Sequence, residues 1–305
     1  MQRYVLKRVA QGIIVLFVVT IIIFVLGQLS GAPVDLMTRH FSTPEVSEQL
    51  RERWGLDESL PVQYWRFISG IARGDFGESV RYGQPALEVW LTYLPNTLIL
   101  ATAAMSIVLI ISIPTGILSA IRVGGWFDKF AKIFAIMGQS MPEYWLGLML
   151  ILAFSIHLGW LPTSGMGTFQ QLLMPAFTLS YYFIASLTRL TRSTMLDVLD
   201  SDYIKMARIK GVPENLVIVK HAFKNALVSI LSLLGVMIIS LPTTSVITEV
   251  VFRWPGIGRL LVNAALERDF PLVRTCFLLI SVGYIVASIV ADILYAYVDP
   301  RIRYK

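Results

Sequence analysis

Long apolar runs separated by short polar segments are the dominant pattern along this chain. A membrane helix needs about 20 mostly apolar residues to cross a hydrocarbon core roughly 30 Å thick. Runs of sufficient length recur, and they occupy residues 9–29, 97–121, 130–157, 174–190, 226–251 and 272–298. The pattern therefore predicts an all-α integral membrane protein with about six transmembrane helices.

Prolines interrupt this pattern at Pro114, Pro142, Pro175 and Pro242, which lie within or at the edges of the apolar runs. Proline removes a backbone donor and bends a helix. Membrane helices tolerate it because neighbouring helices and Ser or Thr side chains satisfy the freed carbonyl groups. We therefore expect the transmembrane helices to form a kinked core bundle.

The alternation of apolar and polar segments divides the chain into three regions. Residues 1–30 are predicted to be an N-terminal transmembrane anchor, because the run exceeds the about 7 to 15 residues of a signal-peptide core. Small residues at 30–32 leave a cleaved signal as the alternative. Residues 31–95 are predicted to be extracytoplasmic with short amphipathic helices. Residues 96–300 are predicted to be a core of five transmembrane helices that includes a cytoplasmic loop, 197–225.

Basic residues set the orientation of membrane proteins, since Lys and Arg are enriched in short cytoplasmic connections. With the N-terminus in the cytoplasm, most of the 26 Lys and Arg residues fall on the cytoplasmic side. Both termini are therefore predicted to be cytoplasmic, and the chain is predicted to be a multi-pass membrane protein.

Composition supports the membrane interpretation and excludes other classes. Of 305 residues, 55% are hydrophobic and 15% are charged, and the mean hydropathy is +0.67, whereas soluble domains carry roughly a quarter charged residues. The net charge of +6 comes from short connections without a basic face interleaved with aromatic residues, so we expect no nucleic-acid partner. The single cysteine, Cys276, lies in an apolar run and permits no internal disulfide or thiolate cluster.

Sequence motifs for catalysis are absent from the chain. No phosphate-binding loop of the Gly-x-x-x-x-Gly-Lys-Ser/Thr type and no Gly-x-Ser-x-Gly elbow occurs. The three histidines, His40, His157 and His221, show no metal-binding spacing. We therefore predict no catalytic, cofactor-binding or metal-binding residue and no enzymatic activity, so any ATP hydrolysis must belong to another polypeptide.

The connection between the fourth and fifth apolar runs carries a patterned helix. Ser201 or Asp202 can begin it, and Gly211 followed by Pro213 is a stop signal. One predicted face is charged and the opposite face is mainly apolar; the charged residues are Asp202, Lys205 and Arg208, and the apolar face comprises Tyr203, Ile204, Met206 and Ala207. An isolated helix of this length is only marginally stable in water, so it must dock on its own bundle, on the lipid interface or on a partner.

The same connection resembles the cytoplasmic loop of permeases from binding-protein-dependent ATP-binding-cassette importers. Residues 202–211 read Asp-Tyr-Ile-Lys-Met-Ala-Arg-Ile-Lys-Gly, and residues 221–226 read His-Ala-Phe-Lys-Asn-Ala. That family has a Glu-Ala-Ala-x-x-x-Gly core, of which Ala207 and Gly211 match outright, while Lys205 and Met206 depart from it. The departures are those of the dipeptide, oligopeptide and nickel branch. Collinear similarity to this branch extends to Trp54-Gly55-Leu56-Asp57, 249–258, 268–271 and 299–303.

The resemblance implies a coupling helix that sits in a cleft of a separate ATPase subunit. It assigns ATPase coupling to nine residues: Asp202, Tyr203, Lys205, Met206, Ala207, Arg208, Gly211, His221 and Asn225. It further implies a second homologous permease subunit, two ATP-binding-cassette ATPase subunits that hold ATP and Mg, an external solute-binding protein and membrane lipid as partners. The alternative is a helix that only anchors the loop at the membrane interface.

Polar side chains within the apolar runs are candidates for a translocation path, because polar groups in hydrocarbon are costly and turn inward. The candidates are Glu143, Ser229, Ser232, Ser281, Tyr284 and Ser288. Packing between helices through small and hydrogen-bonding residues is the alternative explanation.

The predicted function is that of a permease subunit that couples ATP hydrolysis by its partners to the import of a small peptide or a nickel chelate. Selectivity in such importers rests mostly on the receptor, so the sequence leaves the solute open. A stand-alone secondary transporter or channel is the alternative, and it would require intramembrane charges for ion coupling. A third possibility is a membrane-embedded hydrolase, which would require a nucleophile and a base that face each other within the membrane.

Overall fold

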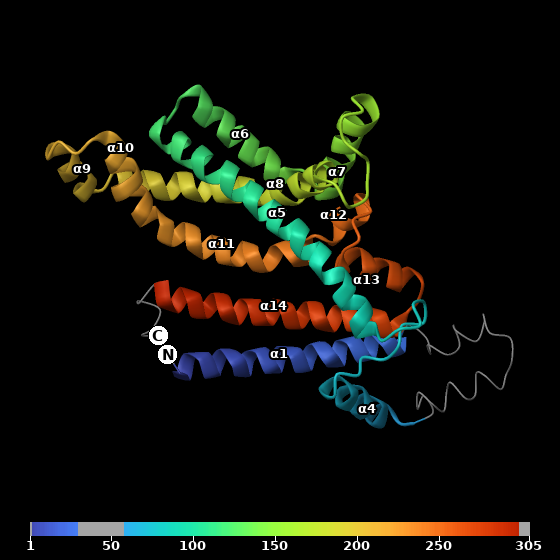
Figure 1. The fold of residues 1–305 in the computed structure, drawn as a ribbon. Helices are drawn as coiled ribbons and strands as arrows, with labels where there is room; N and C mark the ends of the chain where they lie inside the picture. Colours follow the sequence, from blue (N-terminus) through green and yellow to red (C-terminus); the bar gives the residue numbers. More distant parts are fainter. Residues whose placement is uncertain (1, 30–57, 299–305) are drawn as a thin grey trace. The chain divides into compact units, whose positions relative to one another are not determined.

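The computed structural model describes residues 2–29 and 58–298, and within these ranges the regular elements are helices, with one isolated bridge between Glu78 and Pro85. The predicted all-α class is confirmed. The chain divides into two compact units, each drawn in Figure 1. The first takes in described residues of 1–96 and 256–289, and the second takes in described residues of 97–255 and 290–298.

The first unit is built on two long apolar helices that lie side by side. They are α1 (Gln2–Leu29) and most of α14 (Phe270–Val298), and a Cβ atom at Gly12 of α1 would lie 2.9 Å from Ile285 of α14. The shorter elements are α4 (Leu60–Ala72), the start of α5 (Ala86–Ile121) and α13 (Ile257–Leu266).

The helix α4 packs on α1 through aromatic side chains. The ring of Tyr64 lies edge-on to that of Phe24, with 5.4 Å between centroids, and its hydroxyl is 2.9 Å from Thr20 Oγ1. Offset and edge-to-face pairs of this kind add to the free energy gained by burying apolar surface. The preceding part of the predicted extracytoplasmic segment, residues 30–57, lies outside the described residues.

The second unit is a bundle around α8 (Phe169–Leu199), which packs against α6 (Trp126–Ser140) and α11 (Lys224–Thr244) (Figure 1). Buried residues run along most of α8, as expected for the central helix of a bundle. The remaining elements are α7 (Glu143–Leu150), η1 (Ile151–His157), α9 (Asp202–Ile209), α10 (Glu214–Leu216), η2 (Val217–Phe223) and α12 (Val246–Val251).

Within the described residues, four helical stretches are long and apolar enough to cross a membrane: Leu6–Gln28, Ala86–Ile121, Glu214–Val251 and Phe270–Ile293. Two of the six predicted crossings differ from this set. The run at 130–157 is split where Met141 and Pro142 take extended backbone between α6 and α7. The run at 174–190 lies inside the 31-residue α8, which also contains hydroxyl and basic residues.

Prolines have unequal effects on these helices. Pro142 separates two helices, whereas α5 continues through Pro114 and α8 continues through Pro175. Pro242 lies two residues before the end of α11. Pro142 therefore interrupts one predicted crossing, and in the run at 226–251 α11 ends two residues after Pro242, with α12 beginning at Val246.

Glycines permit close approach of α8 to its neighbours. At Gly138 of α6, an added Cβ atom would lie 2.7 Å from the Cβ atom of Ala185 on α8, and at Gly116 of α5 it would lie 2.6 Å from that of Thr191. Small residues at such positions let helix backbones approach closely, which supplies much of the packing energy in membranes.

We expect Gly138→Leu to destabilise the second unit, because the new side chain must push α6 away from α8. Overpacking of this kind costs about 1 to 3 kcal/mol, and thermal unfolding of the detergent-solubilised chain should move to a lower temperature. Gly283→Leu is the matched control, since an added Cβ atom there meets nothing within 4 Å. Equal shifts in the two variants would contradict the close packing of α6 on α8.

Candidate functional site

The predicted coupling helix is present as α9, and its ends follow the sequence signals. Ser201 takes extended backbone before the helix, although its hydroxyl donates to the carbonyl of Val198 and does not cap α9. Asp202 lies in the first turn, where a negative charge is favourable. Gly211 has φ +77°, a conformation that glycine adopts without strain, and it turns the chain towards α10.

One narrow face of α9 is buried in its own bundle. Ile204 is fully buried and Ala207 is partly buried, and both belong to the apolar core of the second unit. Tyr203, Met206 and Ile209 are exposed by 44%, 54% and 80%. The predicted apolar face is therefore divided, because only half of it packs on the bundle. The other half, Tyr203 and Met206, forms an exposed surface together with Ile209, which lies outside the predicted face, and this surface can receive a partner.

A hydrogen-bonded cluster joins α9 to the start of α11. The side-chain amide of Asn225 donates to the hydroxyl of Tyr203 at 2.8 Å and to the carbonyl of His221 at 2.7 Å. The Tyr203 hydroxyl also donates to the His221 carbonyl at 3.2 Å. The structure thus brings together three of the predicted coupling residues, Tyr203, His221 and Asn225, and it joins α9 to the start of α11 by hydrogen bonds.

A bidentate ion pair spans the turn after α9. Arg208 Nε lies 3.1 Å from Glu214 Oε2, and Arg208 Nη2 lies 2.7 Å from Glu214 Oε1. The hydrogen bond to Glu214 raises the pKa of Arg208. Two-point contacts fix orientation as well as distance, so this pair holds the turn at Gly211 in one geometry.

Lys205 lies on the charged face of α9. Its ammonium group is 3.3 Å from Asp200 and 3.6 Å from Asp202. These groups are exposed, and exposed ion pairs contribute little to stability. The predicted residues Asp202 and Lys205 therefore orient the start of α9 without locking it.

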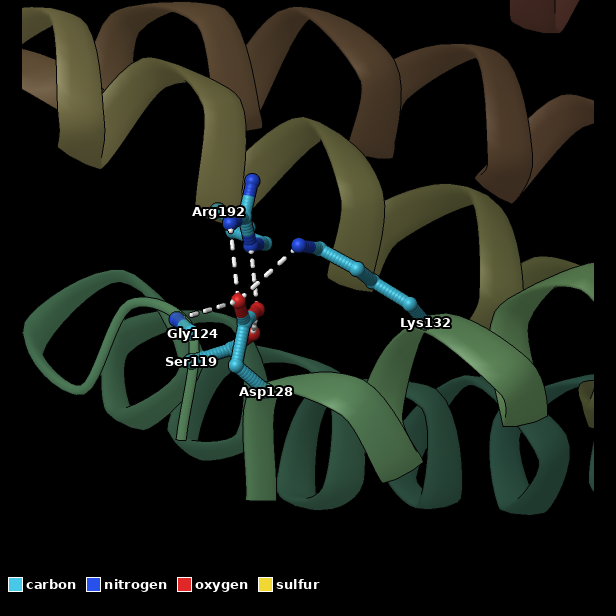
Figure 2. Close-up of polar contacts among 5 residues, drawn as sticks. All are labelled: Ser119, Gly124, Asp128, Lys132 and Arg192. Atoms are coloured by element: carbon cyan, nitrogen blue, oxygen red, sulfur yellow. Dashed lines mark hydrogen bonds and ion pairs between the residues drawn. The ribbon is translucent and has the colours of Figure 1, made fainter. Parts of the chain in front are cut away.

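A buried carboxylate near the junction of α5 and α6 was not among the predicted site residues. Asp128 is fully buried, and its carboxylate accepts hydrogen bonds from Arg192 Nε at 2.6 Å and Arg192 Nη2 at 3.1 Å. It also accepts hydrogen bonds from Ser119 Oγ at 2.5 Å and from the backbone N–H of Gly124 at 3.0 Å. The ammonium group of Lys132 lies 3.0 Å from the same carboxylate (Figure 2). The hydrogen bond from Arg192 is the main reason that the pKa of Asp128 is held far below its usual value.

This cluster around Asp128 anchors the part of α8 that leads to the coupling helix. Arg192 lies on α8 between the buried residues Thr191 and Met195, and α9 begins three residues after α8 ends at Leu199. The signal in the sequence is that Asp128 is the only acidic residue between Glu88 and Glu143. Its partner Arg192 is 64 residues away, which no local pattern reveals.

Candidates for the translocation path are divided between the two units. Ser281, Tyr284 and Ser288 lie on the part of α14 that belongs to the first unit, and Glu143 is in the second. The carboxylate of Glu143 accepts a hydrogen bond from Thr248 and lines a cavity of about 440 Å³ together with residues of α6, α8 and α11. Ser229 and Ser232 lie on exposed positions of α11 and do not line this cavity.

Another buried carboxylate begins the segment 249–258 that carries part of the family resemblance. Glu249 is fully buried and accepts hydrogen bonds from Thr97 Oγ1 at 2.7 Å and Ser245 Oγ at 2.9 Å. Buried charges require such partners. In the described part of the chain, no group of three or more His, Cys, Asp or Glu side chains is placed to hold a metal ion.

Comparisons with known proteins agree over the whole chain. The family model for binding-protein-dependent transport system inner membrane components matches residues 112–304, and the model for the N-terminal part of such membrane components matches residues 1–101. The chain is similar to the oligopeptide transport system permease protein AppB of Bacillus subtilis (strain 168), with 41% identity over 319 residues and 100% of both chains covered.

Further similarities point the same way. The glutathione transport system permease protein GsiC of Escherichia coli (strain K12) is 38% identical over 306 residues, again with 100% of both chains covered. Among solved structures, the MetNI methionine ABC transporter in inward-facing conformations matches with a TM-score of 0.57 and 15% identity, covering 70% of this chain and 97% of the matched chain. An amino acid ABC transporter matches with a TM-score of 0.55 and 16% identity, covering 69% and 94%.

Proposed function

This chain belongs to the family of binding-protein-dependent transport system inner membrane components, and we propose that it imports small peptides, with α9 as the helix that couples it to an ATPase. It is the permease subunit of an ATP-binding-cassette importer of the bacterial inner membrane. The ATPase activity resides in partner subunits, and a solute-binding protein delivers the substrate. A second homologous permease and two ATPase subunits complete the proposed assembly.

The divided apolar face of α9 is the observation that carries the coupling role. Ile204 fixes α9 to its own bundle, while Tyr203, Met206 and Ile209 remain on an exposed surface. An amphipathic helix that docks in a groove uses apolar anchors at this three-residue spacing. A helix that served only the lipid interface would not need the ion pair between Arg208 and Glu214, which holds the turn in one geometry.

The proposed substrate class, small peptides, rests on the names of two relatives. The two relatives reported above are named for oligopeptides and glutathione, both of which are peptides. Neither name mentions nickel, so we propose import of small peptides and not of a nickel chelate. The cavity beside Glu143 supports passage of a polar solute, because a carboxylate and hydroxyl groups of α8 and α11 line it together with apolar side chains.

Transport by the reconstituted complex tests the proposal. The chain is expressed together with the second permease and the ATPase subunits, and the complex is inserted into proteoliposomes. The binding protein is added, and uptake of labelled peptides is measured. We expect uptake that requires ATP and the ATPase subunits. Uptake by this chain alone, driven by an ion gradient, would instead show a secondary transporter.

Asn225→Leu should weaken coupling while the ATPase subunits stay bound. The substitution removes two hydrogen bonds, each of which contributes about 0.5 to 1.5 kcal/mol, so the ratio of peptide transported to ATP hydrolysed should fall by about fivefold or more. Lys224→Leu is the matched control, since Lys224 is exposed and precedes Asn225 on the same helix. An unchanged ratio in the Asn225 variant would show that motion passes from α9 to α11 by another route.

A further inference from the structure

A cavity of about 460 Å³ in the first unit has charged groups of both signs in its lining. It is bounded by α1, α4, residues 75–78 and the beginning of α14. Phe24, Phe67 and Leu278 supply apolar surface, and Arg274, Asp75 and Glu78 supply the charges that carry the argument below. Both α1 and α14 are apolar enough to cross the membrane, so the cavity lies at one end of two membrane helices.

Arg274 is held at the wall of this cavity without an acceptor. Its Nε atom is buried and has no hydrogen-bond partner, and its guanidinium carbon lies 5.7 Å from the centre of the Phe67 ring. Gly27 makes room for it, since an added Cβ atom there would lie 2.6 Å from Arg274 Nη2. Within the described residues, no ion pair or hydrogen bond of Arg274 occurs. An arginine at a membrane boundary usually extends to water, whereas this one is packed on an aromatic ring.

The other charges of the cavity do not neutralise Arg274. Arg66 also lines the cavity, but its guanidinium group is paired with Glu58 at 2.5 Å. Asp75 and Glu78 are exposed, and among the described ion pairs neither is joined to Arg274. A partly buried cation is costly unless an anion meets it. Within the described residues, the cavity therefore offers one unpaired cation, Arg274, and two exposed carboxylates.

We propose that this cavity binds the headgroup of an amine-bearing phospholipid, with the phosphate on Arg274 and the ammonium group beside Asp75 and Glu78. A guanidinium group suits phosphate because its donors match two oxygens at once. The acyl chains lie along the apolar surfaces of α1 and α14. A lipid fits better than a soluble zwitterion, because the cavity adjoins two membrane helices and part of its lining is aromatic and aliphatic.

Lipid retention tests this site independently of transport. The complex containing the full chain is purified from membranes, exchanged into nanodiscs with equal amounts of phosphatidylethanolamine and phosphatidylglycerol, and released for native mass spectrometry. We expect the native chain to retain phosphatidylethanolamine preferentially. Arg274→Gln should reduce retention about tenfold or more, the effect of losing a charge-assisted hydrogen bond. Arg73→Gln, at an exposed arginine outside the cavity lining, should leave retention unchanged.

A second variant keeps the proposal testable if the Arg274 variant fails to fold. The double change Asp75→Asn and Glu78→Gln alters exposed residues only, and it should abolish the preference for phosphatidylethanolamine while total lipid retention persists. Equal retention of both lipids by the native chain would overturn the proposal. Binding of soluble glycerophosphoethanolamine or of a dipeptide as tightly as the lipid would also overturn it, since the site would then serve a solute from water.

Discussion

Ile209→Asp is expected to abolish ATP-driven uptake, because the most exposed apolar side chain of α9 becomes a charge at the proposed docking site for the ATPase. Ile209 is 80% exposed in the chain alone. Anchor residues at the centre of an interface contribute about 2 kcal/mol or more, and burial of an unpaired carboxylate adds to the loss, so affinity for the ATPase should fall by about 30-fold or more. Co-purification of the ATPase subunits measures the effect.

Val219→Asp is the matched control for this prediction. Val219 is aliphatic and 64% exposed, yet it lies on η2 and not on α9. Met206→Asp supplies an independent test of the same surface. Normal ATPase retention in both α9 variants would place the docking surface elsewhere, even if the chain is a permease.

Asp128→Asn should strongly destabilise the folded chain. The asparagine keeps the shape of the side chain but leaves Arg192 without its negative partner, and breaking a buried ion pair costs about 3 to 5 kcal/mol. The melting temperature of the solubilised chain should fall by several degrees. Glu214→Gln makes the same chemical change in the exposed pair with Arg208 and should leave the melting temperature unaltered. A similar drop in both variants would contradict the anchoring role of Asp128.

The pH dependence of this effect follows from the lowered pKa of Asp128. A carboxyl group whose pKa is lower in the folded chain stabilises it above the ordinary value of 3.8, and this stability is lost as pH falls towards the folded value. The difference in melting temperature between the native chain and Asp128→Asn should therefore be constant above about pH 5 and shrink only in stronger acid. A difference that changed near neutral pH would point to another titrating group.

Local signals in the sequence were sufficient for the coupling helix. The stop signal at Gly211 matches its φ of +77°, and the helix occupies Asp202–Ile209 within the predicted segment. Hydropathy also identified the long apolar helices, because length and apolar content are local properties. The roles assigned to the coupling residues and to Glu143 remain predictions.

Features that depend on distant contacts could not be predicted. The periodicity of residues 202–209 predicted which side chains of α9 form its apolar face. It did not predict that Ile204 is buried while Met206 is exposed, because burial depends on which helix packs against each side chain. The pairing of Asp128 with Arg192 joins positions 64 residues apart. The extended backbone at Met141 and Pro142 splits an apolar run whose composition is uniform, so hydropathy alone predicted one crossing.

The exposed trio Tyr203, Met206 and Ile209 also bears on how the cell produces this subunit. With α9 as the proposed docking helix, a chain that enters the membrane before the ATPase subunits are made exposes this apolar surface, and such surfaces favour non-specific association. Proteases in the cell remove chains that fail to reach their assembled state. We therefore expect the chain to be less abundant when it is produced without the ATPase subunits.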